Sequence, residues 1–341
     1  MVLQQTKIVY FGNKQELKKN TKTVMETLIP LWSEFCEIKS YSSYSNKALK
    51  ILDFVFHFFK DGLKAHKIVI DVFSTSAFYF AFILSFLSIV FNKKYILFLH
   101  GGNLPNRQKQ NPKLVSYIFS RAYKIVVPSN YLKSYFEEKG FQVEYIPNSI
   151  ELSLYPFKER KMCQPNLLAI RGFGKPYNPL MTLKAVMNLV KEIPTIQLCM
   201  LGNASDFYYQ EVIDFIEKNN LKNHVTILPK MPQAQWISLS TQYDIMVSNP
   251  VIDNTPLSII EGMALGMCVI STNVGGVSFL ATHRNNALLV ENNDDENLSK
   301  QIVELYKNSS IANSISKNAR LKAEEFNWEI IKNSWIKILQ N

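Results

Sequence analysis

The stretch from Tyr243 to Gly276 constrains the fold most, because it alternates between the patterns of strand and helix. Its segments DIMVS and MCVIST read as short buried strands. The helix between them is expected to begin at Pro256, since proline is tolerated at the first helical position, with Thr255 as the cap. It should end at Gly266, a usual residue after a helix C-terminus. This succession predicts a parallel sheet covered by helices.

Two carboxylates in this stretch predict a ligand site. Asp253 lies in the loop before the helix, and Glu261 lies on the helix among apolar neighbours. Alone, Asp253 fits a solvated loop and Glu261 fits a solvated helix face. Ligands of open α/β sheets bind at the carboxyl ends of the strands, and a helix N-terminus favours phosphate. A buried carboxylate needs donors, which the hydroxyls of a sugar or ribose would supply. The stretch as a whole favours a binding role.

The same alternation runs along the whole chain and restarts after an irregular polar segment at 151–166. A chain of 341 residues is long for one hydrophobic core. We therefore expect α/β architecture with two doubly wound, Rossmann-like domains, 1–155 and 160–326, whose binding edges face a central cleft. A tail helix over 327–341 is expected to pack back on the first domain. Strands are predicted at 7–11, 66–73, 94–100, 124–128, 166–170, 195–201, 225–228, 244–248, 267–272 and 287–290, and the segment 143–150 ends the first half.

The net charge of +10 is confined to the first half, because residues 1–150 hold 20 basic and 10 acidic side chains. Such a surface attracts nucleic acid, anionic membrane or phosphorylated substrates. The first half contains no nucleic-acid-binding motif. We therefore expect contact with an anionic membrane surface or a phosphate-bearing acceptor, and no nucleic-acid partner.

Two apolar segments of the first half have alternative interpretations. Residues 73–91 approach the length of a membrane span, but predicted strands bracket them, which favours a buried crossover helix. Its exposed part could still rest on a bilayer. In the predicted helix 48–65, a core role is favoured over a membrane anchor for Phe54, Phe56, Phe58 and Phe59. Nearby lysines leave the anchor interpretation open.

Cysteine usage and the N-terminus indicate a cytoplasmic protein. The four cysteines are widely spaced without a CxxC pair, which fits buried thiols in a reducing compartment and gives no zinc or disulfide signal. The N-terminus lacks the long apolar core of a signal peptide. We expect a peripheral location at the inner face of the cytoplasmic membrane.

Several further residues at strand ends are candidates for ligand contact. His100 ends a predicted strand and precedes two glycines, whereas an isolated histidine is usually structural. Gly12 follows the first strand, where a tight turn is the simpler interpretation. Arg171 and Lys175 flank two glycines, and two cations there suit a diphosphate as well as a solvated turn.

With these residues in place, the chain resembles a GT-B glycosyltransferase of the large retaining family 4, the group 1 glycosyltransferases. That family carries two acids in the pattern E-x7-E, which stands here as Asp253-x7-Glu261, followed by GMALG, MCVIST and NVGG. The resemblance spans most of the chain and is strongest over 166–276. An aspartate in the first position shortens its reach.

The resemblance implies a role for each matching residue. Asp253 would contact the donor sugar, Glu261 the ribose, and His100 would lie near the anomeric centre, so that His100 and Asp253 are the expected catalytic pair. Asn13 with the preceding glycine would contact the acceptor. The expected donor-binding set is Arg171, Lys175, Gly202, Asp253, Thr255, Pro256, Leu257 and Glu261, where Pro256 replaces a glycine and offers no N–H.

The implied activity is transfer of a sugar from a UDP- or GDP-sugar to a lipid-linked or glycan acceptor with retention of configuration. No strand ends in a D-x-D pair, so a metal-bridged site is not indicated, and we expect neither a metal nor a cofactor. Two alternatives remain. One is a non-catalytic GT-B module that binds a nucleotide, and the other is a sugar-nucleotide 2-epimerase.

Overall fold

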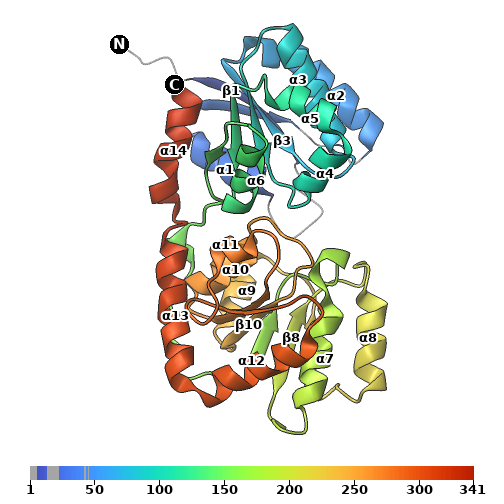
Figure 1. Ribbon diagram of the computed structural model, residues 1–341, viewed down its shortest axis with the longest axis vertical. Helices are drawn as coiled ribbons and strands as arrows, with labels where there is room; N and C mark the ends of the chain where they lie inside the picture. The colour runs from blue at the N-terminus through green and yellow to red at the C-terminus, as the bar shows by residue number, and fades with distance from the viewer. Residues whose placement is uncertain (1–5, 14–22, 42–43, 45) are drawn as a thin grey trace. The chain divides into compact units, whose positions relative to one another are not determined.

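The computed structural model describes residues 6–13, 23–41, 44 and 46–341 (Figure 1). The charged stretch 14–22, predicted to lead into the first helix, lies outside the described residues. The chain forms two compact units, one of Met1–Asn148 with Ile331–Asn341 and one of Ser149–Ile330. The sequence prediction placed the division at 155–160 and at 326.

The first unit contains a six-stranded parallel sheet in the order β2-β1-β3-β4-β5-β6. Its strands are β1 (Lys7–Phe11), β2 (Glu37–Tyr41), β3 (Lys67–Val72), β4 (Tyr95–Leu99), β5 (Lys124–Val127) and β6 (Glu144–Tyr145). Its helices are α1 (Val24–Trp32), α2 (Lys47–Lys60), α3 (Phe78–Val90), α4 (Leu104–Gln110), α5 (Pro112–Phe119), α6 (Asn130–Glu138) and the end of α14 (Trp328–Gln340).

The second unit contains another six-stranded parallel sheet, in the order β12-β11-β10-β7-β8-β9. Its strands are β7 (Asn166–Ala169), β8 (Gln197–Leu201), β9 (Val225–Leu228), β10 (Ile245–Ser248), β11 (Cys268–Thr272) and β12 (Leu288–Val290). Its helices are α7 (Pro179–Leu189), α8 (Tyr209–Lys218), α9 (Gln233–Ser240), α10 (Leu257–Ala264), α11 (Val277–Leu280), α12 (Asp295–Lys307) and α13 (Ser309–Glu324).

Both sheets have a point where the strand order reverses, as the prediction of doubly wound α/β architecture requires. The reversal falls between β1 and β3 in the first unit and between β7 and β10 in the second. In open parallel sheets, ligands bind outside the carboxyl ends of the two strands at such a point. Ligand-binding residues are therefore expected in the loops after these four strands.

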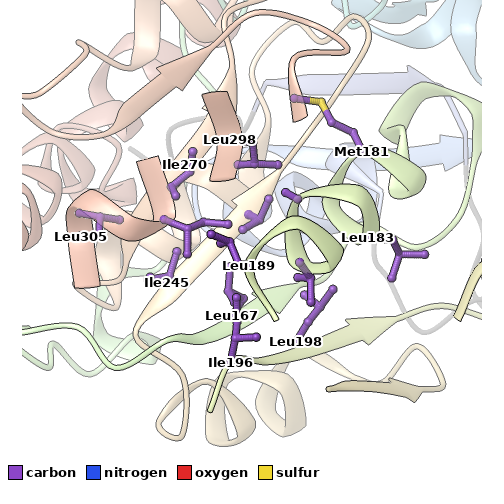
Figure 2. Packing of buried hydrophobic residues seen from close by; sticks show 14 of the residues in the cluster. Leu167, Met181, Leu183, Leu189, Ile196, Leu198, Ile245, Ile270, Leu298 and Leu305 are labelled. Carbon is purple, nitrogen blue, oxygen red and sulfur yellow. The ribbon is translucent and has the colours of Figure 1, made fainter. Parts of the chain in front are cut away.

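The core of the second unit fixes where those strand ends lie. Apolar side chains of the sheet meet those of α7, α8 and α12. Figure 2 shows this packing for labelled residues of the sheet, α7 and α12. Every other residue on a strand points to the same face, so this packing allows one register only. The first unit closes in a similar way, and there Trp335 of α14 contacts Trp32 and Phe98.

The structure differs from the sequence analysis in some of its elements and in where one helix begins. Strand β2 and helices α4 and α5 were not predicted. Helix α10 begins at Leu257, so Pro256 is the N-cap residue with extended backbone (φ −70°, ψ 105°) and not the first helical residue. That dihedral pair is outside the helical region.

The four phenylalanines of α2 are not all core residues. Phe54 and Phe58 are buried, whereas Phe56 and Phe59 are exposed. At about 100° per residue, positions two and five after Phe54 point away from the face that Phe54 and Phe58 share.

The segment around α3 forms a helix between β3 and β4, as the favoured interpretation required. Its 13 residues correspond to a length of about 20 Å, against the roughly 30 Å of a bilayer core. No helix among the residues that the structure describes combines the length and apolar character that a membrane crossing needs.

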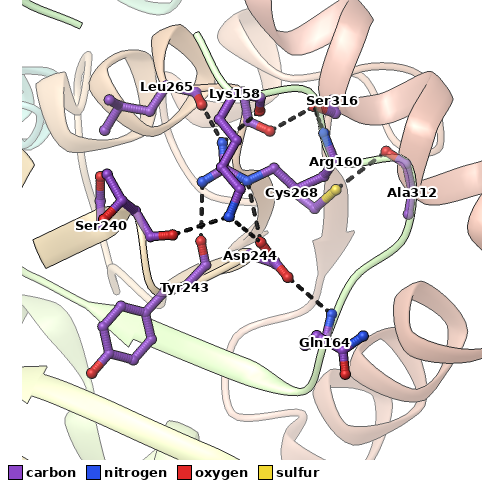
Figure 3. Close-up of polar contacts among 12 residues, drawn as sticks. Lys158, Arg160, Gln164, Ser240, Tyr243, Asp244, Leu265, Cys268, Ala312 and Ser316 are labelled. Carbon is purple, nitrogen blue, oxygen red and sulfur yellow. Dashed lines mark hydrogen bonds and ion pairs between the residues drawn. The ribbon is translucent and has the colours of Figure 1, made fainter. Parts of the chain in front are cut away.

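A buried arginine joins the start of β10 to the end of α10 (Figure 3). The side chain of Arg160 is 2% exposed, and its Nε lies 3.4 Å from a carboxylate oxygen of Asp244. Its guanidinium donates to the backbone carbonyls of Lys158 (2.7 Å), Tyr243 (3.0 Å) and Leu265. A cation at the C-terminal carbonyls of a helix is favourable both as a hydrogen-bond donor and through the helix dipole.

We predict that Arg160→Met lowers the free energy of unfolding by about 3–5 kcal/mol, because it removes the buried cation beside Asp244 and leaves several buried carbonyls without their donor. The matched control is Lys158→Met. Lys158 also lies near Asp244 (3.5 Å) but is half exposed, so its loss should cost less than about 1 kcal/mol. Urea unfolding of both variants measures the difference, and equal losses would contradict the prediction.

Candidate functional site

The reversal point of the second sheet brings together two predicted donor-binding residues. Arg171 lies after β7 and Asp253 after β10, and these strands are neighbours. Their side chains form an ion pair, with Arg171 Nη2 3.0 Å from Asp253 Oδ2. The guanidinium also lies 4.5 Å from the ring centre of Tyr177. The pair is partly exposed, so a ligand can compete for either member.

Glu261, the second acid, lies on α10 close to this pair. Its Oε1 accepts hydrogen bonds from the Tyr155 hydroxyl (2.7 Å) and from Gln233 Nε2 (3.1 Å). Burial raises the pKa of Glu261, whereas these two donors and the charge of Arg171 act in the opposite direction. The charge of Arg171 therefore acts on both acids of the predicted motif. Tyr155 and Gln233 were missed, since nothing in the sequence joins them to Glu261.

The double glycine of NVGG holds the loop that carries Asp253. A Cβ on Gly276 would lie 1.5 Å from the carbonyl oxygen of Asn254, so only glycine permits this approach. The Gly276 N–H donates to the carbonyl of Asp253 (3.0 Å). The loop therefore leads from a fixed backbone position into the predicted donor-binding residues Thr255 and Pro256, which precede α10, and Leu257, its first residue.

A partly buried carboxylate, that of Asp206, supports the turn after β7. Asp206 Oδ2 accepts from the N–H groups of Phe173 (3.0 Å) and Asn203 (3.2 Å), and Asp206 Oδ1 lies 3.0 Å from Lys230 Nζ. Burial opposes ionisation of Asp206, but these donors outweigh it and lower the pKa of the carboxyl. A Cβ on Gly172 would lie 2.4 Å from Lys230 Cε, so this lysine packs against the turn. Lys230 is a basic residue at the site that sequence reasoning missed.

The remaining predicted donor residues have other contacts. Lys175 is exposed, and its Nζ lies 4.0 Å from the ring centre of Phe207. The Gly202 N–H donates to the carbonyl of Leu228 (2.9 Å), and a Cβ there would lie 2.2 Å from the ring of Phe173. Gly202 thus allows close packing beneath the turn.

The reversal point of the first sheet forms a separate site around Asp71 of β3. Asp71 Oδ1 lies 2.7 Å from His100 Nε2 and accepts from the Tyr10 hydroxyl (2.7 Å). Its Oδ2 accepts from the N–H of Asn13 (3.3 Å), and a Cβ on Gly12 would lie 2.3 Å from this oxygen. The structure therefore brings predicted catalytic and acceptor residues of this unit to one carboxylate. Asp71 was missed, although it is the one acid in an apolar strand.

A cavity of about 190 Å³ opens beside Gly12, Asn13 and Asp71. Its walls are largely aromatic and aliphatic, and α2 contributes the cation of Lys50. Lys50 Nζ donates to Asn13 Oδ1 (3.1 Å). Burial lowers the pKa of Lys50, and the charges of Asp71 and Asp53 oppose this effect. The cavity offers one cation, one carboxylate and an apolar wall.

The described residues contain no group of three or more His, Cys, Asp or Glu side chains arranged to hold a metal ion. Metal independence stays a prediction.

Comparisons with known proteins bear on this geometry. Residues 156–322 match the family model of glycosyl transferases group 1. An uncharacterised glycosyltransferase of Methanocaldococcus jannaschii is 25% identical over 239 residues, which are 69% of this chain and 65% of that protein. The match thus covers slightly less than two thirds of this relative's length.

Solved structures show the same fold at low identity. Sucrose-phosphate synthase from Thermosynechococcus elongatus superposes with a TM-score of 0.80 at 16% identity, over 98% of each chain. HepE from Anabaena, in complex with UDP-glucose, gives 0.78 at 15% identity, over 98% of this chain and 99% of that one. At such identities the likeness establishes the fold.

Two parallel doubly wound units, each with polar residues at its reversal point, define a protein of the GT-B fold class. Within that class, the second unit is similar to the group 1 glycosyl transferases, whose family model it matches.

We predict that Glu261→Gln gains stability relative to the wild type as pH rises above about 4.5, the ordinary pKa of this carboxyl. A carboxyl whose pKa is raised on folding binds its proton more tightly in the folded state. The wild type therefore loses stability as pH rises from the ordinary pKa towards the raised one, whereas glutamine does not titrate. Melting temperatures of both proteins across this range provide the test, and a constant difference would contradict it.

Proposed function

We propose that this chain transfers a glycosyl group from a nucleotide sugar to an acceptor hydroxyl. The observation that carries the proposal is the ion pair of Arg171 and Asp253 at the reversal point of the second sheet, next to Glu261. The group 1 family match over this unit supports the same function.

The donor diphosphate would take the place of Asp253 as the partner of Arg171. A guanidinium binds phosphate oxygens in a fork, and the exchange releases the Asp253 carboxylate to accept from the sugar hydroxyls. Glu261, held by Tyr155 and Gln233, would accept from the ribose hydroxyls. UDP is the first nucleotide to test, because HepE, which shares the fold, is described with UDP-glucose bound.

In the proposed reaction, the bond between the anomeric carbon and the diphosphate oxygen breaks while the acceptor oxygen bonds to that carbon. The acceptor proton passes to the departing diphosphate. Negative charge builds on the leaving group, and a cation already in place stabilises that charge without reorganisation. Retention of configuration would follow from attack on the face that the diphosphate leaves. NMR of the product's anomeric centre tests this point.

The acceptor would bind in the cavity of the first unit. Its apolar wall and Lys50 suit an acceptor that carries an anionic group beside a less polar part, such as a lipid-linked glycan. Asp71 would fix the orientation and tautomer of His100, so it is a positioning residue.

We predict that Arg171→Met weakens binding of UDP and GDP by about 10- to 100-fold, since a hydrogen bond to a charged group contributes about 1.5–3 kcal/mol. Lys191→Met, an exposed cation of the same unit, is the matched control and should bind as the wild type does. Calorimetric titration measures both. Unchanged affinity in Arg171→Met would remove this residue from the site, and tight binding without turnover of any donor would favour a non-catalytic module.

We predict that Asp71→Asn lowers the transfer rate constant kcat by roughly 100-fold with unchanged nucleotide affinity, because the histidine loses the carboxylate that orients it. Asp61→Asn is the control, since Asp61 is a well-hydrogen-bonded carboxylate of the same unit, partnered by Lys39 and Tyr41. If donor cleavage and transfer are the same in Asp71→Asn and the wild type, His100 and Asp71 take no part in the reaction.

A further inference from the structure

Helix α2 presents an apolar stripe to solvent. Spacings of three and four residues place its members on one face. Leu52 is 66% exposed and Phe56 is 60% exposed, values usual for charged surface residues. The stripe consists of Leu49, Leu52, Phe56 and Phe59.

Helix α3 continues this apolar surface. The exposed rings of Phe59 and Phe91 lie edge to face, with centroids 5.3 Å apart. Phe86 and Val90 of α3 are exposed as well. Figure 1 shows α2 and α3 running side by side in the first unit. The two stripes form one surface, here termed the α2–α3 face and defined by Leu49, Leu52, Phe56, Phe59, Phe86, Val90 and Phe91.

The segment that forms the α2–α3 face is rich in lysine, and Lys60 borders the face directly. Residues 47–94 contain seven lysines and three acids, and no acid occurs between 72 and 94. Among the described residues, no carboxylate lies within ion-pair distance of Lys47, Lys60 or Lys94. Lys60 Nζ lies 5.7 Å from the ring centre of Phe56, so its aliphatic stem follows the apolar surface to the charged end.

The acids of α2 and its C-terminal end are already partnered. Asp53 lies 3.4 Å from His57 Nε2. Asp61 is paired with Lys39 (2.8 Å), and the hydrogen bonds from Lys39 and Tyr41 lower the pKa of its carboxyl to about 2. With seven lysines against three acids in residues 47–94, this region carries a net positive charge.

We propose that the α2–α3 face docks on an anionic lipid bilayer, with its apolar side chains in the interface and its lysines at the lipid head groups. Apolar side chains flanked by lysines are the arrangement that lies in a membrane interface. A second copy of this chain would bring like charges together, so an anionic surface is the better fit. The proposal stands apart from the transfer chemistry.

The acceptor cavity lies between the same two helices. Lys50 and Phe54 of α2 line it together with Phe80, Ala81 and Leu84 of α3. The exposed stripe lies on the opposite side of α2 from Phe54, so docking of the α2–α3 face would leave this cavity uncovered.

Co-sedimentation with vesicles tests the proposal directly. The full chain should bind vesicles of phosphatidylcholine mixed with phosphatidylglycerol, bind phosphatidylcholine alone much more weakly, and lose binding as salt increases. The double variant Leu52→Ser/Phe56→Ser should bind about tenfold more weakly or worse, because it removes two inserted apolar side chains. Lys60→Gln should lose about fivefold for one head-group charge.

Matched controls come from the second unit. Leu321 is 62% exposed and Ile330 60% exposed, so Leu321→Ser/Ile330→Ser removes equal apolar surface elsewhere. Lys191→Gln removes an exposed lysine. Both should bind as the wild type does, and melting temperatures show that all variants fold.

Three results would overturn the proposal: no binding to anionic vesicles, equal binding to neutral ones, or equal loss in test and control variants. A dimer that becomes monomeric in Leu52→Ser/Phe56→Ser, with no vesicle binding by the wild type, would identify the face as a contact between two copies.

Discussion

The site of the second unit depends on a buried guanidinium at the back of the sheet. Arg160 binds the carbonyls at the start of β10 and at the end of α10 together with Asp244. These are the two ends of the segment whose middle carries Asp253 and Glu261. Because a buried cation must satisfy nearly all its donors, its position is strictly determined. The loop between β10 and α10 is thereby held from both sides.

A second arginine extends this support to Glu261. Arg320 Nη1 donates to the carbonyls of Ala264 (2.8 Å) and Tyr155 (3.0 Å). The same Tyr155 donates its hydroxyl to Glu261. One guanidinium therefore fixes both the end of the helix that carries the acid and the residue that binds it. This shared support holds the carboxylate of Glu261, whose pKa is raised by burial, in one orientation.

Local pattern identified the parts of the site that are close in sequence. The strand, loop and helix from 244 to 264 were predicted within a residue or two, and with them the placement of Asp253 and Glu261. Gly276 was predicted as part of the NVGG motif, and glycine is needed there because a Cβ would collide with the carbonyl of Asn254. Asp71, Tyr155, Gln233 and Lys230 could not be predicted, because each acts through a partner brought near by the sheet order. The exposed aromatic stripe of α2 was assigned to the core because composition favours burial and does not distinguish two faces of one helix.

The sequence by itself determined that this chain forms two parallel α/β units, because alternating strands and helices bury their apolar faces in few other ways. It also determined which loops carry glycines, acids and cations. Only the tertiary structure decided which of these residues meet. Arg171 and Asp253 are 82 positions apart and form an ion pair because β7 and β10 are neighbours at the reversal point. Strand order depends on the packing of the whole unit, which no local stretch of sequence contains.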